Sequence, residues 1–324
     1  MTIVFRARPV KQLLRAKSPF KAEAVIDMSC CTPNGAVRKI GMRCKETIMN
    51  EPYTAKIPSV ANESEVGAAD DTLFVASLAK GLRILECFDG GRERLSFTEI
   101  DARAGIGKSA AQRAVHTLHT LGYLKKDDAA KRYRLAPKLL SLTAFYSAGA
   151  NVLDVGLPEL RRCHEETGET VNLTERDGTD IVCIARIPGR HAVTINIGIG
   201  WRLPAYATGP GLIMLAYEPE DVARRVLERS QLKSFTKQTV TDINELMGWM
   251  KQIRQDGYII ADQLLHDGEY SIAAPILDSH GVILAAFNLS LPVSRWSLHD
   301  LRNKMVPLVR ETASRISRQI SGAD

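Results

Sequence analysis

One helical pattern dominates the chain between residues 108 and 121. Its apolar positions recur at helical spacing, which buries one side against a core: Ala111, Ala114, Val115, Leu118 and Leu121. The opposite side is polar and carries no acid: Ser109, Gln112, Arg113, His116, Thr117 and Thr120. A solvated helix face usually mixes Glu with Lys, whereas these side chains suit phosphates and base edges. The pattern predicts a helix that contacts nucleic acid.

A second, shorter helix is predicted just before it. Ser96 and Glu99 have the spacing of a capping box, and Phe97, Ile100 and Ala104 would face inward. The glycine turn at residues 105–107 ends this helix, Ser109 is expected to cap the next one, and Gly122 closes it. Two helices joined by a tight glycine turn predict a helix-turn-helix.

A basic hairpin is predicted directly after the second helix. Residues 123–126 and 131–135 alternate as strands, and residues 127–130 form the tip between them. The two strands carry five Lys and Arg, so the hairpin resembles the wing of a winged helix. A three-helix domain that packs against another protein is the competing interpretation.

Two further helices are predicted around this unit. One opens at Ser77, ends at the glycine pair 90–91 and carries this apolar stripe: Leu78, Leu82, Ile84, Leu85 and Phe88. The other follows Ala136 and has four apolar side chains: Leu139, Leu140, Leu142 and Phe145. Two interpretations of this second helix remain open: a connecting helix with a dimer contact, or part of the first domain's core.

From residue 155 the pattern predicts helices around an antiparallel sheet. Helices are expected at 155–167, 212–217, 219–229, 242–255 and 298–320. Strands are expected at 170–174, 181–185, 193–197, 257–261, 270–276 and 282–290. The predicted fold class is α+β, with domains at 72–136 (winged helix-turn-helix), 137–150 (linker helix) and 151–324 (sensor-like).

Charge is distributed unevenly along the 324 residues. Residues 72–150 hold 13 Lys and Arg against 7 Asp and Glu, whereas residues 151–324 hold 19 against 22. The basic excess therefore coincides with the helix-turn-helix, which is typical of a phosphate-backbone partner.

The first 71 residues show no sustained periodicity. They are basic and polar, and they contain five prolines, so we expect a disordered extension. An organelle transit peptide and a translation start further on, at Met42 or Met49, are the alternatives.

The composition gives no indication of catalytic, metal or membrane chemistry. The six cysteines are scattered without a CxxC pair, and neither a GxSxG nor an HExxH motif occurs. No apolar run is long enough to span a bilayer. We expect no catalytic residue, no cofactor, no metal, no membrane contact and a reduced, cytoplasmic setting.

Taken together, residues 72–320 resemble the IclR family of bacterial transcription regulators. The segments that carry the resemblance are Ser77–Leu82 with Ile84 and Leu85, the helix with Lys108, Ser109 and Arg113, Arg132–Leu135, Leu203–Thr208, and Ser271–Pro275. The resemblance implies an N-terminal winged helix, a GAF-like effector-binding domain, and homodimers or tetramers that bind palindromic double-stranded DNA operators.

Two segments are most similar to the branch that regulates aromatic acid catabolism through the β-ketoadipate pathway. They are Pro204–Thr208 and Ala286–Ser290. This similarity implies a small, aromatic carboxylic acid as effector, such as protocatechuate or 4-hydroxybenzoate, or else 3-oxoadipate. The chain departs from the branch at Gly209–Leu212, where that branch tends to have Ser-Met-Gly-Arg. A response to a small 2-oxo or 2-hydroxy acid, such as glyoxylate or pyruvate, is the alternative.

The candidate DNA contacts fall into two groups. Major-groove contacts are expected from the polar helix face: Ser109, Gln112, Arg113, His116 and Thr120. Contacts to phosphates or the minor groove are expected from the wing: Lys125, Lys126, Arg132 and Arg134. A structural role in the strand is the alternative for Arg134.

The resemblance implies the effector contacts. They are Thr208, Gly209, Gly211, Asp262, Ser271, Asn288 and Ser290. A helix start suits a carboxylate, and alternation places Asn288 and Ser290 on one face of a strand. For Ser271, Asn288 and Ser290 the alternative is that they only satisfy backbone groups. Three basic side chains near the hairpin are further carboxylate partners, or members of a solvated loop: Arg186, Arg190 and His191.

Overall fold

The computed structural model describes the backbone at residues 29–31 and 37–39, and full residues at 73–88, 93–149, 151–190 and 197–322. The chain divides into two units, Met1–Pro52 and Tyr53–Asp324. In the first, β1 (Ser29–Cys31) pairs antiparallel with β2 (Val37–Lys39), a hairpin that the sequence pattern did not predict. The remainder of the predicted extension, residues 1–71, lies outside the described residues.

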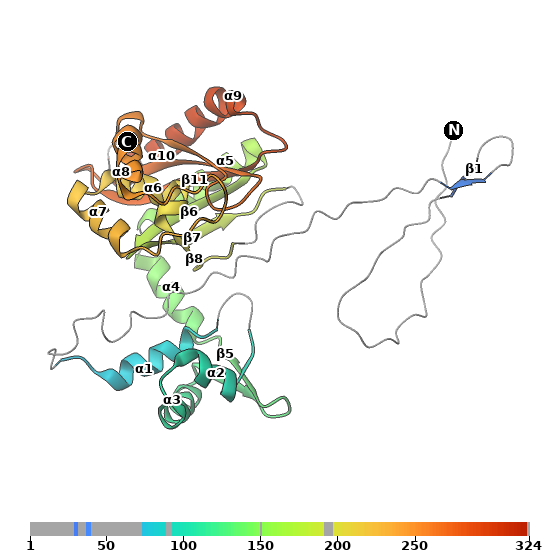
Figure 1. Ribbon diagram of the computed structural model, residues 1–324, viewed down its shortest axis with the longest axis vertical. Helices are drawn as coiled ribbons and strands as arrows, with labels where there is room; N and C mark the ends of the chain where they lie inside the picture. The colour runs from blue at the N-terminus through green and yellow to red at the C-terminus, as the bar shows by residue number, and fades with distance from the viewer. Residues whose placement is uncertain are drawn as a thin grey trace. The chain divides into compact units, whose positions relative to one another are not determined.

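The second unit begins with a winged helix-turn-helix, as predicted (Figure 1). Its elements are α1 (Ala76–Leu85), β3 (Leu95–Ser96), α2 (Phe97–Ala104), α3 (Lys108–Thr120), β4 (Leu124–Asp127) and β5 (Arg132–Leu135). The three strands form an antiparallel sheet in the order β3-β5-β4. The capping box is present, since Ser96 Oγ accepts from the Glu99 N–H at 3.3 Å and Glu99 Oε2 from the Ser96 N–H at 2.7 Å.

Several predicted details of this domain are wrong. Helix α3 begins at Lys108 with Gly107 as its N-cap residue, so Ser109 does not cap it. Helix α1 ends at Leu85, before the glycine pair, and only the Ile84 side of its apolar stripe is buried. Leu78 and Leu82 stay 62% and 50% exposed, because the helix packs on α3 by its other face.

Helix α4 (Leu139–Gly149) does not belong to the core of the winged helix domain. Its apolar side chains are exposed, with Leu140 at 69% and Phe145 at 72%. Its Tyr146 hydroxyl donates to Glu175 Oε2 at 2.7 Å. The core interpretation of this helix is therefore wrong, and the connecting helix with a dimer contact stays a prediction.

The C-terminal part is built on one antiparallel sheet of six strands in the order β8-β7-β6-β11-β10-β9. The strands are β6 (Thr170–Asp177), β7 (Asp180–Ile187), β8 (Arg202–Pro204), β9 (Ile259–Asp262), β10 (Glu269–Leu277) and β11 (Ile283–Pro292). Strand β8 was not predicted, and of the strand predicted at 193–197 only residue 197 is described. The fold class, α+β, is as predicted.

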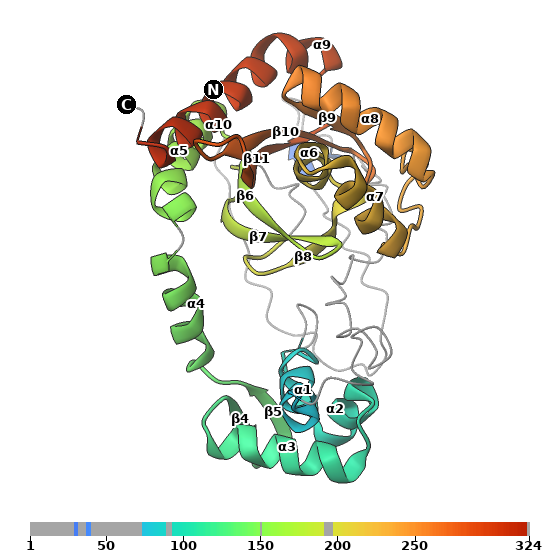
Figure 2. The same cartoon turned by 90° about the vertical axis from the view of Figure 1, so that its left-hand side faces the viewer.

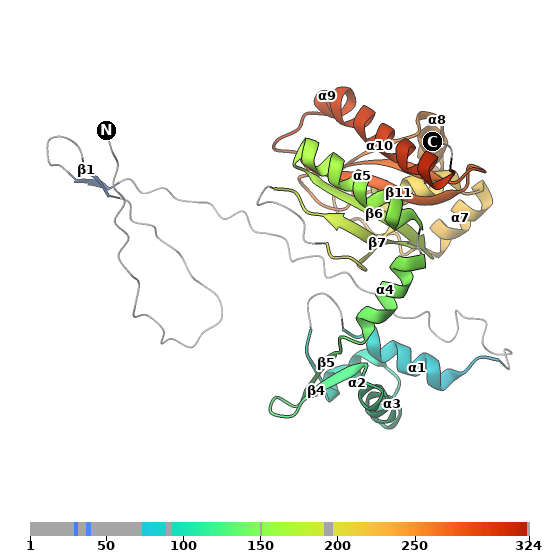
Figure 3. The same ribbon diagram turned by 180° about the vertical axis from the view of Figure 1, so that it is seen from behind.

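Helices cover both faces of this sheet (Figures 2 and 3). Helices α5 (Asn151–Thr167) and α10 (Val306–Ile320) pack on one face, and α6 (Gly209–Tyr217) packs on the other. Beyond α6 lie α7 (Glu220–Arg229) and α8 (Ile243–Asp256). The short helix η1 (Ala205–Ala207) precedes α6, while α9 (Leu298–Asp300) and the π-helical turn η2 (Leu301–Met305) continue into α10.

Strand alternation divides the interior into two cores. On β11, Ala285, Phe287 and Leu289 join the core under α5 and α10. Ala286, between them, joins the core under α6 and α8, and Asn288 turns toward the same side. The polar residues of the sheet are thus gathered on the α6 face.

Candidate functional site

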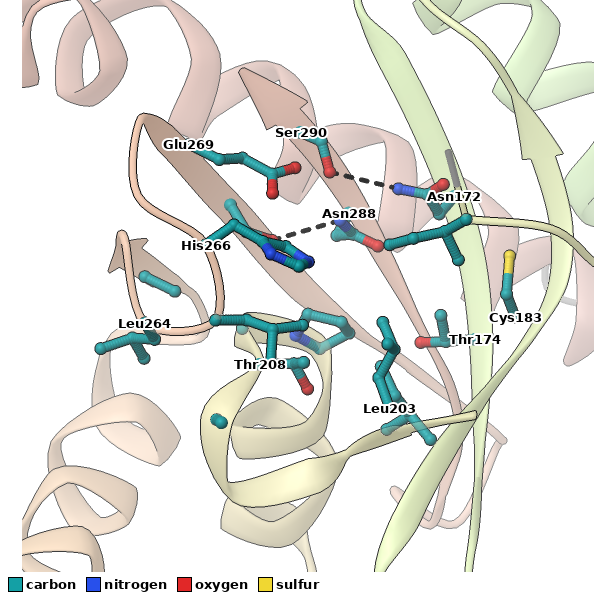
Figure 4. A pocket seen from close by; sticks show the side chains of 18 residues that line it. Asn172, Thr174, Cys183, Leu203, Thr208, Leu264, His266, Glu269, Asn288 and Ser290 are labelled. Carbon is teal, nitrogen blue, oxygen red and sulfur yellow. Dashed lines mark hydrogen bonds between the residues drawn. The ribbon is translucent and has the colours of Figure 1, made fainter. Parts of the chain in front are cut away.

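A small cavity lies on the α6 face of the sheet (Figure 4). The volume of the cavity is about 60 Å³, which is several times the volume that one water molecule needs. Its apolar wall is formed by Ile181, Cys183, Ile197, Leu203, Ala207, Pro210, Ala261, Leu264 and Leu265. Its polar groups come from Asn172, Thr174, Thr208, Gly209, His266, Glu269, Ser271, Asn288 and Ser290. An apolar cleft with a few convergent polar groups is typical of a small-molecule site.

The strand register explains why these polar groups meet. Asn288 on β11 lies opposite Asn172 on β6, and Ser290 lies opposite Ser271 on β10. Glu269 stands two residues before Ser271, and therefore on the same face of β10.

The first turn of α6 closes one side of the cavity. Thr208 is its N-cap residue, and Thr208 Oγ1 accepts from the Gly211 N–H at 3.2 Å. Gly209 approaches the sheet closely, since a Cβ there would lie 3.1 Å from Ser271 Oγ and 3.3 Å from Ala261 Cβ. A side chain at position 209 would therefore narrow the cavity.

Hydrogen bonds fix the orientation of the two asparagines. Arg186 Nη1 donates to Asn172 Oδ1 at 2.8 Å, so the Asn172 amide nitrogen faces Ser290 Oγ, 3.5 Å away. Asn288 Nδ2 donates to Ser271 Oγ at 3.2 Å. Asn288 Oδ1 is buried and has no hydrogen-bond partner.

The ionisable groups of the cavity are perturbed by burial. Desolvation raises the pKa of Glu269, although the Ser290 hydroxyl and the Arg186 charge oppose this shift. Burial lowers the pKa of His266, which favours its neutral form, and raises the pKa of the Cys183 thiol to about 11. The Cys183 thiol therefore contributes a neutral, weakly polar wall.

The structure brings five of the seven predicted effector residues to this cavity: Thr208, Gly209, Ser271, Asn288 and Ser290. Gly211 is not among them, because it packs against the backbone of Ala205. Asp262 is also elsewhere, since alternation along β9 turns Ala261 into the cavity and Asp262 into a separate surface groove.

The basic residues near the hairpin have other positions. Arg186 stands behind Asn172 without lining the cavity, Arg190 is exposed and His191 lies outside the described residues. Sequence reasoning missed four polar groups of the cavity: Asn172, Thr174, His266 and Glu269. The Asn172–Thr174 alternation was a usable signal, but nothing in the sequence pointed to His266 or Glu269.

The predicted recognition face is exposed along α3. All five predicted base-contacting residues are accessible: Ser109, Gln112, Arg113, His116 and Thr120. Gln112, Arg113 and His116 line an open groove that Lys126 and Tyr133 of the wing border from the other side. His119 lines the same groove, and its Nδ1 lies 3.1 Å from the Leu124 carbonyl oxygen, a contact that joins α3 to the wing.

The four basic residues of the wing differ in their exposure and in whether an internal partner already binds them. Lys125 and Arg134 are exposed, and Lys126 Nζ pairs with Asp128 at 2.7 Å. Arg132 is half-buried and bound within the domain, where Nη1 contacts Glu99 Oε2 at 3.1 Å and the Arg94 carbonyl oxygen at 2.9 Å. Lys125 and Arg134 are the better placed to reach phosphates.

Within the described ranges, no group of three or more His, Cys, Asp or Glu is placed to hold a metal ion. Over the same residues, no helix is both long and apolar enough to cross a bilayer.

A winged helix followed by a domain with a small-molecule cavity defines a class, the ligand-responsive DNA-binding regulators. Two family models match the chain: the IclR helix-turn-helix domain over residues 77–128, and the bacterial transcriptional regulator IclR C-terminal domain over residues 144–318. The second covers more than half of the 324 residues. The chain belongs to the IclR family of bacterial transcriptional regulators.

Curated relatives and solved structures agree with this assignment. The Pca regulon regulatory protein of Pseudomonas putida is 32% identical over 86% of this chain and 99% of its own. The p-hydroxybenzoate hydroxylase transcriptional activator of Acinetobacter baylyi is 30% identical over 75% and 91%. An IclR homologue from Microbacterium hydrocarbonoxydans, solved with 4-hydroxybenzoate, is 27% identical at a TM-score of 0.66 over 76% and 99%. These relatives are regulators, as the absence of catalytic motifs predicted.

Proposed function

We propose that the protein regulates genes of aromatic acid catabolism in response to a small aromatic carboxylic acid bound in the cavity beside α6. The main support is a cavity with a mainly apolar surface and a polar side built from Ser271, Asn288 and Ser290. The names of the Pca and p-hydroxybenzoate regulators support the class of effector. We propose the domain limits 72–136, 137–150 and 151–324, and a cytoplasmic location beside the chromosome.

A thermal-shift screen of the full chain tests the effector class. A ligand that binds only the native state raises the melting temperature by mass action. We expect 4-hydroxybenzoate or protocatechuate to raise it, and Asn288→Ala to reduce the rise while Glu245→Gln, exposed on α8, preserves it. A response to glyoxylate or pyruvate alone would favour the 2-oxo acid alternative. No response to any acid would refute the assignment of the cavity.

We further propose that homodimers or tetramers bind a palindromic operator through α3 and the wing. Effector binding would shift the population between two placements of the paired winged helices, only one of which matches the half-site spacing of about one helical turn or a multiple. Arg113→Ala should weaken operator binding by about tenfold or more in fluorescence anisotropy, because a base contact is lost. The matched control is Arg225→Ala, since Arg225 is equally exposed but pairs with Asp221 on α7. Equal affinities of the two variants would exclude Arg113 from the interface.

A further inference from the structure

One side of the cavity presents a buried hydrogen-bond acceptor that has no partner among the described residues. The Asn288 side chain donates its amide to Ser271, so its oxygen is left over, and Asn288 is only 4% exposed. A buried amide oxygen without a partner costs free energy unless a ligand or an ordered water donates to it. The cavity therefore holds a place for a donor.

A second acceptor, Glu269, stands at the end of a directed chain of hydrogen bonds. Arg186 donates to Asn172, the Asn172 amide nitrogen faces Ser290, and the Ser290 hydroxyl donates to the Glu269 carboxylate. Because Arg186 can only donate, it fixes the orientation of the Asn172 amide, whose nitrogen therefore faces Ser290. Figure 4 shows Glu269 beside Ser290, with Asn288 below them and Thr208 lower still. The chain satisfies part of the carboxylate and leaves its remaining lone pairs for the cavity.

The charges around the cavity set the orientation of an acidic ligand. Among the described residues that line it, Glu269 is the one carboxylate, and none is Lys or Arg. A ligand carboxylate next to Glu269 would add a second negative charge to a desolvated place. The carboxylate of the ligand therefore points away from Glu269, toward the α6 side where Thr208 and Gly209 lie.

We propose that Glu269 and Asn288 are specificity-determining residues that accept a hydrogen bond from a hydroxyl or amino group of the effector, at the end remote from its carboxylate. This inference rests on the proposed function, because it assumes an aromatic acid in the cavity. It adds what the family assignment leaves open, namely which ring substituent is required and which side chains require it. Sites built to bind a substrate hydroxyl reject the analogue without it strongly, because their buried polar groups are then unpaired.

Isothermal titration calorimetry of the full chain tests this with three ligands of nearly equal size. These are 4-hydroxybenzoate and 4-aminobenzoate, which carry a donor opposite the carboxylate, and 4-fluorobenzoate, which does not. We expect 4-fluorobenzoate to bind at least about tenfold more weakly than the two donors. The comparison uses the unmodified protein, so it does not depend on any variant folding.

Two substitutions then assign the preference to its residues. Asn288→Leu and Glu269→Leu should each reduce the hydroxy-to-fluoro affinity ratio by about fivefold or more, whereas Asn288→Asp and Glu269→Gln, which keep an acceptor oxygen, should retain the preference. Glu245→Gln is the matched control and should leave the ratio unchanged.

The failures of the two proposals are distinguishable. Equal binding of all three benzoates would overturn the role of Glu269 and Asn288 and leave the proposed function intact. Binding of none of them would refute the proposed effector class itself. A preference that survives in both Asn288→Leu and Glu269→Leu would show that other groups select the donor.

Discussion

Gly209 and Gly211 lie two residues apart in the first turn of α6, and the structure predicts opposite consequences when each is replaced by alanine. A Cβ at Gly211 would lie 2.2 Å from the carbonyl oxygen, 2.4 Å from the Cα and 2.6 Å from the carbonyl carbon of Ala205. All three atoms belong to the backbone of η1, so α6 must move away by about 1 Å. Overpacking of this kind costs about 3 kcal/mol or more in the free energy of unfolding.

The expected fall in melting temperature follows from the size of the domain. For about 150–250 residues, each kcal/mol lowers the midpoint by about 2–4 °C, so Gly211→Ala should melt about 6–12 °C lower. At Gly209 the nearest atom is the Ser271 hydroxyl, at 3.1 Å, which can rotate. Gly209→Ala should therefore keep its melting temperature within about 3 °C and lose effector affinity, because the rotated hydroxyl no longer accepts from Asn288.

Differential scanning calorimetry with and without effector measures both effects. Gly248→Ala is the matched control, since Gly248 lies within α8 and nothing is within 4 Å of its added Cβ. Alanine there should be neutral or stabilising by up to about 1 kcal/mol, through the difference in helix propensity. A Gly211→Ala protein that melts within 2 °C of the native one would refute the packing argument, as would a Gly209→Ala protein with unchanged effector affinity.

Three further predictions concern charge. Burial raises the pKa of Glu269, so the native state binds the carboxyl proton more tightly than the unfolded state and loses stability as the pH rises through the interval between the unfolded and folded pKa values. Glu269→Gln should therefore raise the melting temperature at pH 7 but not at pH 4. Equal changes in melting temperature at both pH values would contradict this. Arg134→Ala should lower the slope of log operator affinity against log salt concentration by about one, measured by fluorescence anisotropy. Arg132→Ala should chiefly lower the stability of the domain, because Arg132 binds Glu99 and the Arg94 carbonyl oxygen. Arg315→Met should cost about 2 kcal/mol or more in urea unfolding, because Glu159, 3% exposed, loses the guanidinium whose Nε lies 2.9 Å away and keeps only Arg162, at 3.6 Å. An unchanged midpoint would contradict this.

The winged helix could be predicted closely from sequence because its signals are local. The Ser96–Glu99 capping box, the glycine turn after α2 and the helical period of α3 each lie within a few residues. Local rules failed at the start of α3, where more than one residue is suitable as the N-cap. Ser109 has the chemistry of an N-cap, yet the N-cap lies two residues earlier, at Gly107, whose φ of 84° suits glycine.

The cavity could be predicted only in part, because it depends on strand register. Asn172 and Asn288 are 116 residues apart, and only the β6–β11 pairing brings them together. Resemblance placed Asp262 at the effector, but a one-residue step along β9 separates the cavity face from the outer face, and Ala261 occupies the former. Glu269 was missed because it follows a loop whose path the sequence pattern does not specify.

The same alternation that builds the cavity also connects it to the helix that follows the linker. Asn172 and Thr174 line the cavity, while Leu173 between them is buried on the opposite face against α5. The contact is tight, since a Cβ at Gly156 of α5 would lie 3.1 Å from Leu173 Cδ2. We therefore expect a displacement of β6 by the effector to act on α5, which follows α4 and the winged helix in the chain. A ligand that prefers one position of β6 would then also prefer one position of α5, which is a physical route for the proposed population shift.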